Sequence, residues 1–287
     1  MSEGNGLVNF GGLSKPATVL IEKISDAVGG IAKPWHIRRV AQAEADASII
    51  QANALMQVSE IQQRALVRMV QEEGQKQENI ENITAKAITH LAEDAQPDNI
   101  EKDWLTHFFD RSRLVSDDEM QSLWANVLAG QANKPGSFTK RTVELVATLD
   151  KADAQLFTKF CTFAWMIGEL CPLIFDEQND IYQSMGINFS TLTHLDDIGL
   201  ISFNNISGFE KRGFGKYVTI FYYGRAINIE FPEDSNVFPL GKILLTRAGQ
   251  ELAPICGSTP SDDYFSYVLT EWHKRGYILS SPIKARS

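Results

Sequence analysis

The chain has 287 residues and a mass of 32.0 kDa, which predicts two domains at roughly 100–200 residues each. Hydrophobic residues make up 44% and charged residues 22%, which excludes a wholly disordered chain, a collagen-like chain and a polytopic membrane protein. The formal net charge of −9 argues against a protein that coats nucleic acid. Three cysteines without a CxxC pair indicate a reducing compartment, so we expect a cytoplasmic protein.

Residues 1–34 predict a flexible start followed by one short amphipathic helix. Ser14 and Pro16 form a helix start signal, and apolar residues then recur at the spacing of one helix face. That face consists of Ala17, Leu20, Ile21, Ile24, Ala27, Val28 and Ile31. The basic residues in and after it are Lys15, Lys23, Lys33, Arg38 and Arg39. Such a helix can lie on an anionic membrane, but we favour the alternative that it packs on the protein itself or on a sister subunit.

Residues 35–96 predict a long helix or a helical hairpin, a coiled-coil-like arm, because they hold no proline before Pro97 and only one glycine, Gly74. A continuous helix would approach about 85 Å in length. It must therefore fold back near residues 73–77 or pair with another chain, and we expect self-association. The stripe that would assemble the subunits is Ala47, Ile50, Ala54, Val58, Ile61, Ala65 and Met69, and the stripe resumes at Ile80, Ile83, Ala87 and Leu91.

Residues 97–180 predict a helical domain. We expect helices from Pro97 through Phe109, from Ser116 to Asn133, over 140–149 and over 152–170. Ser116 and Glu119 have the spacing of a capping box. The run from Phe160 to Phe175 is the most apolar of the chain, but it is shorter than the ~20 residues of a membrane span. We interpret it as a buried core helix in which Cys161 and Cys171 are packing residues.

Residues 181–287 predict a smaller, winged-helix-like α+β domain. A helix near 190–198 precedes the short apolar run 199–203. Strands are expected over 216–223 and 226–231 around a turn at Gly224-Arg225, and a helix begins near Thr246. The fold class is therefore mainly α with a smaller α+β C-terminal part: a long helical arm, a helical middle domain and a winged-helix-like end.

The middle of the chain is similar to the signature of a bacterial family labelled domain of unknown function 2806. The residues that carry the likeness are DDEMQ at 117–121, LWANVLAG at 123–130, KPGSF at 134–138 and RT at 141–142, with GLS at 12–14 and KPWHIRR at 33–39 upstream. The resemblance covers most of the chain and implies no established activity. A looser similarity to the alpha-type abortive-infection proteins of bacteria rests on the order of elements and on LTRAG at 245–249. It implies a role in anti-phage defence.

The charges argue against recognition of DNA. No Lys or Arg occurs between Lys159 and Lys211, and the expected recognition helix, 188–197, ends in two acids. Phosphate contacts need basic side chains on the docking face. Lys211, Arg212 and Lys216, among the aromatics Phe209, Phe214 and Tyr217, could touch a nucleic-acid backbone, but we favour a solvated hairpin with an aromatic core face. The glycines of residues 208–215 suit its tip.

No pattern of catalytic, cofactor-binding or metal-ligating residues emerges from the sequence. The histidines at 36, 90, 107, 194 and 273 are scattered, and GxSxG, Walker A and GxGxxG motifs are absent. His107, Asp110, Arg111 and Arg113 cluster at helical spacing, which we interpret as capping and salt bridging. We therefore expect no enzyme and no cofactor.

Two functions from different classes remain, and a third stands behind them. The first is a non-enzymatic, self-associating bacterial interaction protein, with itself and an unidentified protein as partners and a setting in anti-phage defence. The second is a membrane-acting effector at the inner membrane, engaged through Leu20, Ile21, Ile24, Val28 and Ile31 with Lys23, Lys33, Arg38 and Arg39. The third is a winged-helix DNA-binding regulator.

Overall fold

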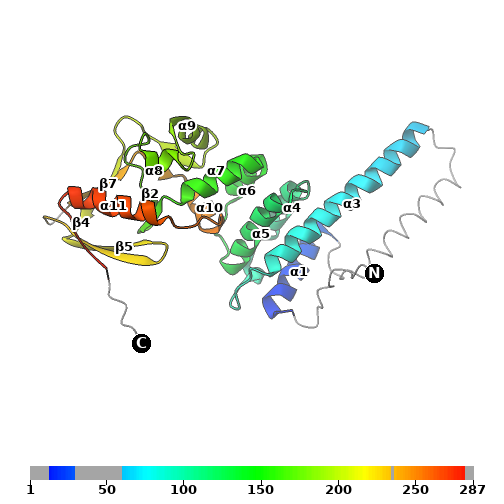
Figure 1. The fold of residues 1–287 in the computed structure, drawn as a ribbon. Helices are drawn as coiled ribbons and strands as arrows, with labels where there is room; N and C mark the ends of the chain where they lie inside the picture. The colour runs from blue at the N-terminus through cyan, green and yellow to red at the C-terminus, as the bar shows by residue number, and fades with distance from the viewer. Residues whose placement is uncertain (1–12, 30–59, 234–235, 282–287) are drawn as a thin grey trace, which may run out of the picture. The chain divides into compact units, whose positions relative to one another are not determined.

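The computed structural model describes residues 13–29, 60–233 and 236–281 (Figure 1). The chain divides into two compact units, the first ending at Ala147 and the second beginning at Thr148. Residues 148–180, which we expected in the helical domain, therefore belong to the second unit. The described residues are mainly helical, and the strands lie in the second unit.

The first unit is built from helices. Helix α3 runs without interruption through residues 73–77, so the fold-back that we considered there is wrong for the described residues. The described helices of the first unit are α1 Lys15–Val28, α3 Glu60–Ile88, the 3-10 turn η2 Pro97–Asn99, α4 Lys102–Ser112, α5 Asp118–Asn133 and α6 Lys140–Thr148.

The second half of α3 packs along α5 and joins the core of the first unit. Ile83 and Ala87 are fully buried there, as the second apolar stretch predicts. A buried amide pair fixes the register of the helices, because Gln121 Nε2 donates to Asn79 Oδ1 at 3.2 Å and Asn79 Nδ2 donates to the Arg113 carbonyl at 2.9 Å. Every polar atom in such a pair needs a partner, which makes a helix slip costly.

The segment that resembles the family signature closes a loop around Phe138. A Cβ built on Gly130 would lie 2.6 Å from the Phe138 ring, so only glycine allows the ring to seat on α5. Phe138 N–H donates to Gln131 Oε1 at 3.0 Å, and Trp104 Nε1 donates to the Phe138 carbonyl at 2.8 Å. The N-cap of α5 is Asp117, whose carboxylate accepts from two backbone N–H groups; Ser116 as the cap was wrong by one residue.

The described residues of the second unit form short helices and three antiparallel sheets. Strand order in the largest sheet is β2-β1-β5-β6-β9, and β3 pairs with β8 and β4 with β7. The helices are α7 Lys151–Cys161, α8 Asp180–Gln183, α9 Phe189–Asp197, α10 Arg247–Leu252, the 3-10 turn η3 Ala253–Ile255 and α11 Asp262–Lys274. The strands are β1 Ala164–Ile167, β2 Glu169–Pro172, β3 Ile201–Phe203, β4 Phe209–Phe214, β5 Tyr217–Tyr222, β6 Arg225–Glu230, β7 Asn236–Gly241, β8 Ile243–Leu245 and β9 Ile278–Ser280.

The apolar run from Phe160 to Phe175 is not a helix, so that prediction was wrong. Helix α7 ends at Cys161, and the hairpin β1–β2 follows. Gly168, with φ of 79°, makes its turn. Trp165 and Ile167 point inward while Met166 is exposed, which is the two-residue period of a strand. A short apolar run does not reveal by itself which period it follows.

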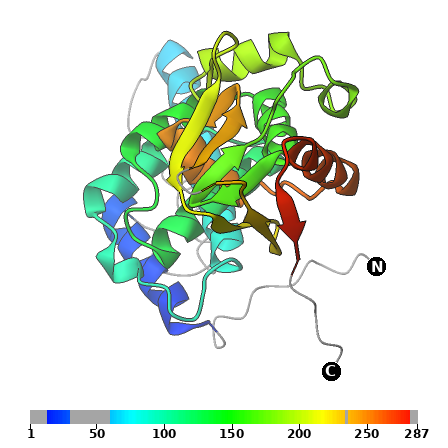
Figure 2. The same cartoon turned by 90° about the vertical axis from the view of Figure 1, so that its left-hand side faces the viewer.

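One face of the five-stranded sheet is covered by α11, as Figure 2 shows from the side. The Trp165 ring lies 4.8 Å from Trp272 and 4.9 Å from Tyr222, centroid to centroid, and all three are fully buried. The opposite face keeps apolar side chains at the surface, among them Met166 and Phe221, which are register partners.

The strands predicted over 216–223 and 226–231 are present as β5 and β6, inside this sheet and not as a projecting wing. Tyr222 pairs with Arg225, so Tyr223 and Gly224 form the turn, one residue earlier than expected. Residues 209–214, expected at a hairpin tip, form strand β4.

The seat of Phe138 gives a paired prediction for two helix-interior glycines of the first unit. Gly130→Ala should lower the free energy of unfolding by roughly 1–3 kcal/mol, because the new methyl group displaces the ring. Gly74→Ala, where a Cβ meets nothing within 4 Å, should instead raise it by roughly 0.5–1 kcal/mol. Urea denaturation followed by circular dichroism measures both, and equal effects would contradict the proposed seat.

Candidate functional site

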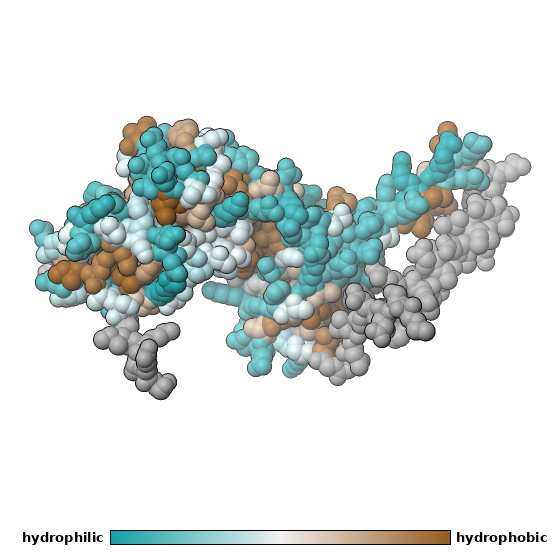
Figure 3. All heavy atoms as spheres, viewed as in Figure 1, coloured by the Kyte–Doolittle hydropathy of each residue, from teal (hydrophilic) through white to brown (hydrophobic). Residues whose placement is uncertain are grey.

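Helix α3 changes character along its length. Ile61 and Met69 are 71% and 61% exposed, and Ala65 between them is exposed too. At 3.6 residues per turn this face continues into Ile83 and Ala87, which are buried against α5. Figure 3 shows apolar residues in brown along this otherwise teal part of the helix. Ala47, Ile50, Ala54 and Val58, the rest of the predicted assembly stripe, lie outside the described residues.

The exposed half of α3 is apolar on more than one side. Val67 is 46% exposed, and Leu66 and Val70 are half-buried. Flanking charges are paired along the helix, Arg64 with Glu60 and Arg68 with Glu72. A helix with apolar residues around most of its circumference needs more than one neighbour to bury them.

Helix α1 uses its apolar face inside the first unit. Leu20 and Ile24 are fully buried, and α1 packs on α4 and η2. Lys23 Nζ donates to the carbonyls of Asp98 at 2.6 Å and Ile100 at 3.2 Å. Ile21 and Val28 are half-buried, while Ile31, Lys33, Arg38 and Arg39 lie outside the described residues. Leu20 and Ile24 can meet lipid only after leaving this core. None of the described helices is both long enough and apolar enough to cross a bilayer.

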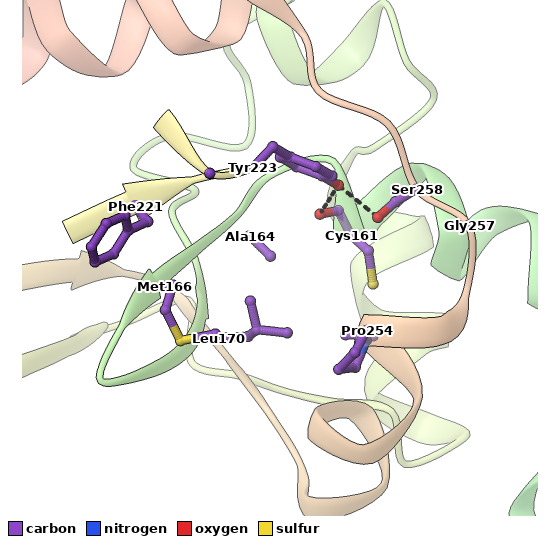
Figure 4. Close-up of a pocket in the computed structure, with 11 residues that line it drawn as sticks. Cys161, Ala164, Met166, Leu170, Phe221, Tyr223, Pro254, Gly257 and Ser258 are labelled. Carbon is purple, nitrogen blue, oxygen red and sulfur yellow. Dashed lines mark hydrogen bonds between the residues drawn. The ribbon is translucent and has the colours of Figure 1, made fainter. Parts of the chain in front are cut away.

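A pocket of about 300 Å³ opens on the uncovered face of the five-stranded sheet. In the close-up of Figure 4, Met166, Leu170 and Phe221 form one wall, Pro254 lies across from them, and Cys161, Tyr223 and Ser258 close the end. The walls are mostly apolar. Hydroxyl, thiol and carbonyl groups gather at one end, which is the arrangement of a small binding site.

Tyr223 closes the pocket from a strained position. Its φ of 46° lies in the left-handed region, where a bulky side chain is rare, and Gly224 follows with φ of 78°. Its hydroxyl donates to the Cys161 carbonyl at 3.1 Å, and Ser258 Oγ lies 2.6 Å from the same hydroxyl oxygen, to which the serine can donate. Burial raises the pKa of Tyr223 to about 12, so the phenol remains a donor at neutral pH. These bonds offset the unfavourable backbone.

Two of the three cysteines lie close to the pocket, Cys161 in its wall and Cys256 directly before Gly257, which also lines it. Thr158 Oγ1 donates to the Cys256 carbonyl at 3.0 Å. Hydrogen bonding with the Cys161 side chain is the largest cause that lowers the pKa of Cys256 to about 7. Burial raises the pKa of Cys161 well above its ordinary value. Cys161 and Cys171 are both buried, as expected for packing residues, but they do not share one helix, because Cys161 ends α7 and Cys171 lies on β2.

The three basic residues that could contact a nucleic-acid backbone each form an ion pair with an acid of the second unit. The ion pairs are Lys211–Glu169, Arg212–Glu210 and Lys216–Glu230. In addition, Lys211 donates to the Ile167 carbonyl at 2.8 Å. Phe214 packs on Phe231 and Phe238, as expected for an aromatic core face.

The polar cluster of α4 converges on an acid that the local sequence did not indicate. Glu144 Oε1 of α6 lies 3.1 Å from His107 Nε2 and 2.9 Å from an Arg111 guanidinium nitrogen. Arg113 pairs with Asp110 at 2.8 Å. Within the described ranges, no group of three or more His, Cys, Asp or Glu side chains could hold a metal ion.

Residues 63–269 match the family described as protein of unknown function (DUF2806). The chain belongs to this family. No curated protein and no solved structure gives a significant match. The family signature therefore covers the part of α3 from residue 63 onward, the Phe138 loop and most of the second unit.

The sequence did not indicate the pocket. Its walls come from the end of α7, from β1 and β2, from the end of β5, and from η3 with the residues after it, which are far apart in the chain. One signal was available: a tyrosine at the first turn position of a tight hairpin, where Asn or Gly is the usual choice.

Removal of the Tyr223 hydroxyl tests whether its hydrogen bonds hold the turn. Tyr223→Phe keeps the ring and the left-handed φ but loses the bonds to Cys161 and Ser258, so the free energy of unfolding should fall by about 1 kcal/mol. Tyr217→Phe, at a residue 69% exposed on the same sheet, serves as the control and should change it little. Guanidinium unfolding measures both, and equal stability of the two variants would contradict this role.

Proposed function

We propose that the protein is a non-enzymatic interaction protein that assembles with copies of itself through α3. The observation that carries the proposal is the apolar surface of the first half of α3, with Ile61 71% and Met69 61% exposed. Exposed apolar side chains at this spacing mark helix pairing surfaces.

A second copy of the chain is the occupant that we favour for this surface. The face of Ile61, Ala65 and Met69 is the direct extension of the α3–α5 contact, so a helix placed there would continue a packing mode that the chain already uses. The α3 of a partner subunit carries the same apolar residues and the same paired charges. Such a self-complementary contact is typical of twofold homodimers.

The second unit offers a separate contact surface for a partner protein. Its pocket of about 300 Å³ is lined by apolar side chains, and the same sheet face exposes Phe221 and, further along, Tyr217 and Ile278. One apolar or aromatic side chain of a partner would fill the pocket, with the sheet face around it.

The two alternative functions receive less support. A membrane-acting effector would have to release Leu20 and Ile24 from the core of the first unit. A DNA-binding regulator would have to free Lys211, Arg212 and Lys216 from their acids, and the two acids Asp196 and Asp197 end α9, which was the expected recognition helix.

The assembly proposal is tested by the absolute mass of the full chain in solution. Wild-type protein should elute as a dimer or larger species, a multiple of 32.0 kDa. Ile61→Glu combined with Met69→Glu should shift it to the monomer, because two buried carboxylates would oppose pairing. Size exclusion coupled to light scattering gives the mass.

Gln71→Glu is the matched control. Gln71 is exposed on the same helix and points away from the Ile61 face, so it adds charge without entering the contact and should leave the mass unchanged. A wild-type protein that is monomeric over a wide concentration range would refute assembly through α3.

We propose anti-phage defence as the setting, on the order of elements and the residues 245–249 that led us to expect a resemblance to abortive-infection proteins. In cells that carry the wild-type chain, plaque counts should fall, and the Ile61→Glu, Met69→Glu double variant should lose this protection while Gln71→Glu retains it. Equal protection by all three proteins would contradict the proposal that defence requires assembly through α3.

A further inference from the structure

The pocket on the uncovered face of the five-stranded sheet has walls that favour an aromatic ring. Met166 and Phe221 are cross-strand partners in one wall, and each is 42% exposed. A thioether and a phenyl ring both make favourable contacts with an aromatic ligand. Pro254 lies across from them in Figure 4, so a flat ring would be held between two apolar walls. The volume of about 300 Å³ is at the lower end for ligand pockets, which indicates a small ligand.

The pocket is electrically neutral. None of the described residues that line it is Asp, Glu, Lys, Arg or His. Its two weakly acidic side chains stay protonated at neutral pH, because burial raises the pKa of Tyr223 to about 12 and the pKa of Cys161 well above its ordinary value. A charged ligand would lose its hydration here without gaining a counter-charge. The pocket therefore selects a neutral molecule.

The side-chain hydrogen bonds at the polar end leave Ser258 as an acceptor. A carbonyl oxygen can only accept, so the Tyr223 hydroxyl hydrogen points to the Cys161 carbonyl at 3.1 Å. The Tyr223 and Ser258 hydroxyl oxygens are 2.6 Å apart, which requires a hydrogen between them. That hydrogen comes from Ser258, because the phenol hydrogen is already engaged. The Ser258 oxygen keeps lone pairs for a ligand, and the Cys161 thiol is only a weak donor.

The strained turn sets the direction of the Tyr223 hydroxyl. Tyr223 has a φ of 46°, in the left-handed region that a bulky side chain rarely adopts. Such strain persists where the surrounding structure enforces it, and it is concentrated at binding and active sites. Here it directs the phenol to the junction of α7 with residues 257–258, where its hydrogen bonds decide which groups remain for a ligand.

We propose that the pocket binds a neutral aromatic ring that carries one N–H or O–H donor, as indole and phenol do. The ring lies between Met166, Phe221 and Pro254, and its donor points to Ser258 Oγ. It belongs either to a free small molecule or to a Trp or Tyr side chain of a protein partner, and this second source rests on the contact surface proposed above. The hydrogen-bond chemistry is the same for both.

The test compares indole with N-methylindole, which has the same ring but no N–H donor. The full chain carries isotope-labelled methionine methyl groups, and the Met166 resonance, assigned with Met166→Leu, reports binding through the ring current of the ligand. Indole should shift it in a saturable way, with a Kd roughly tenfold lower than that of N-methylindole, because N-methylindole leaves Ser258 Oγ without a partner. The Met69 resonance of α3 should not move.

Ser258→Ala removes the acceptor. It should weaken the binding of indole roughly tenfold and leave that of N-methylindole nearly unchanged, so the preference disappears. A merely structural role of Ser258 would weaken both ligands alike. Thr219→Ala is the matched control, because it removes a hydroxyl from an exposed position of β5, on the face of Phe221 but outside the pocket. It should keep the full preference, and circular dichroism confirms that each variant is folded.

N-acetyltryptophanamide distinguishes the two sources of the ring. Tighter binding than that of indole supports the proposal with a partner side chain as the source. Binding of indole without N-acetyltryptophanamide supports it with a free molecule as the source, and it contradicts the partner contact at this pocket.

The proposal is overturned if neither indole nor N-methylindole shifts the Met166 resonance, or if the two bind equally well to the wild-type chain. Both outcomes are independent of assembly through α3, because no residue of the pocket lies on α3 and the mass in solution is measured without a ligand.

Discussion

The packing of the second half of α3 on α5 is the contact on which the first unit depends. Ile83 and Ala87 are fully buried in it, and the Asn79–Gln121 amide pair sets its register. In the first half of the helix the same face continues, but its residues Ile61 and Met69 are exposed instead of buried against α5. One continuous α-helix therefore contributes both a core element and an apolar surface, and the proposed assembly follows from that division.

The residues that carry the family signature serve the fold. Trp124 is fully buried against Phe108, and Gly130 leaves room for the Phe138 ring. Gln131 and Trp104 then bind the backbone on either side of that ring. These contacts give the residues of this segment a structural role, which is to close a loop over α5.

Much of the helical part could be predicted from the sequence. Helix α5 was expected from its apolar period and a cap placed one residue too early, α9 was expected near residues 190–198, and α10 was expected to begin near Thr246. These signals are local: a capping side chain acts within one turn, and the apolar period repeats within a few turns. The hairpin β1–β2 was not predicted, because an apolar run of that length fits both the period of a helix and the period of a strand.

The pocket could not be predicted for a different reason. Cys161 and Ser258 come together in its wall only after α7 and the segment following η3 have packed, and no local pattern records this proximity. The ion pairs of Lys211 and Lys216 depend in the same way on strand order. Sequence periodicity identifies elements, while the chemistry of their junctions follows from tertiary pairing.

Gly74 lies where the buried and exposed halves of α3 meet, and its surroundings are open. In a helix interior, glycine is less favourable than alanine by roughly 1 kcal/mol in free energy, so the turn that contains it is the least stable one. Bending α3 therefore costs least at this turn, which separates the exposed half from the half that packs on α5. An assembly built on that arm would tolerate a range of angles between its subunits, and the stiffness of a single turn would set that range.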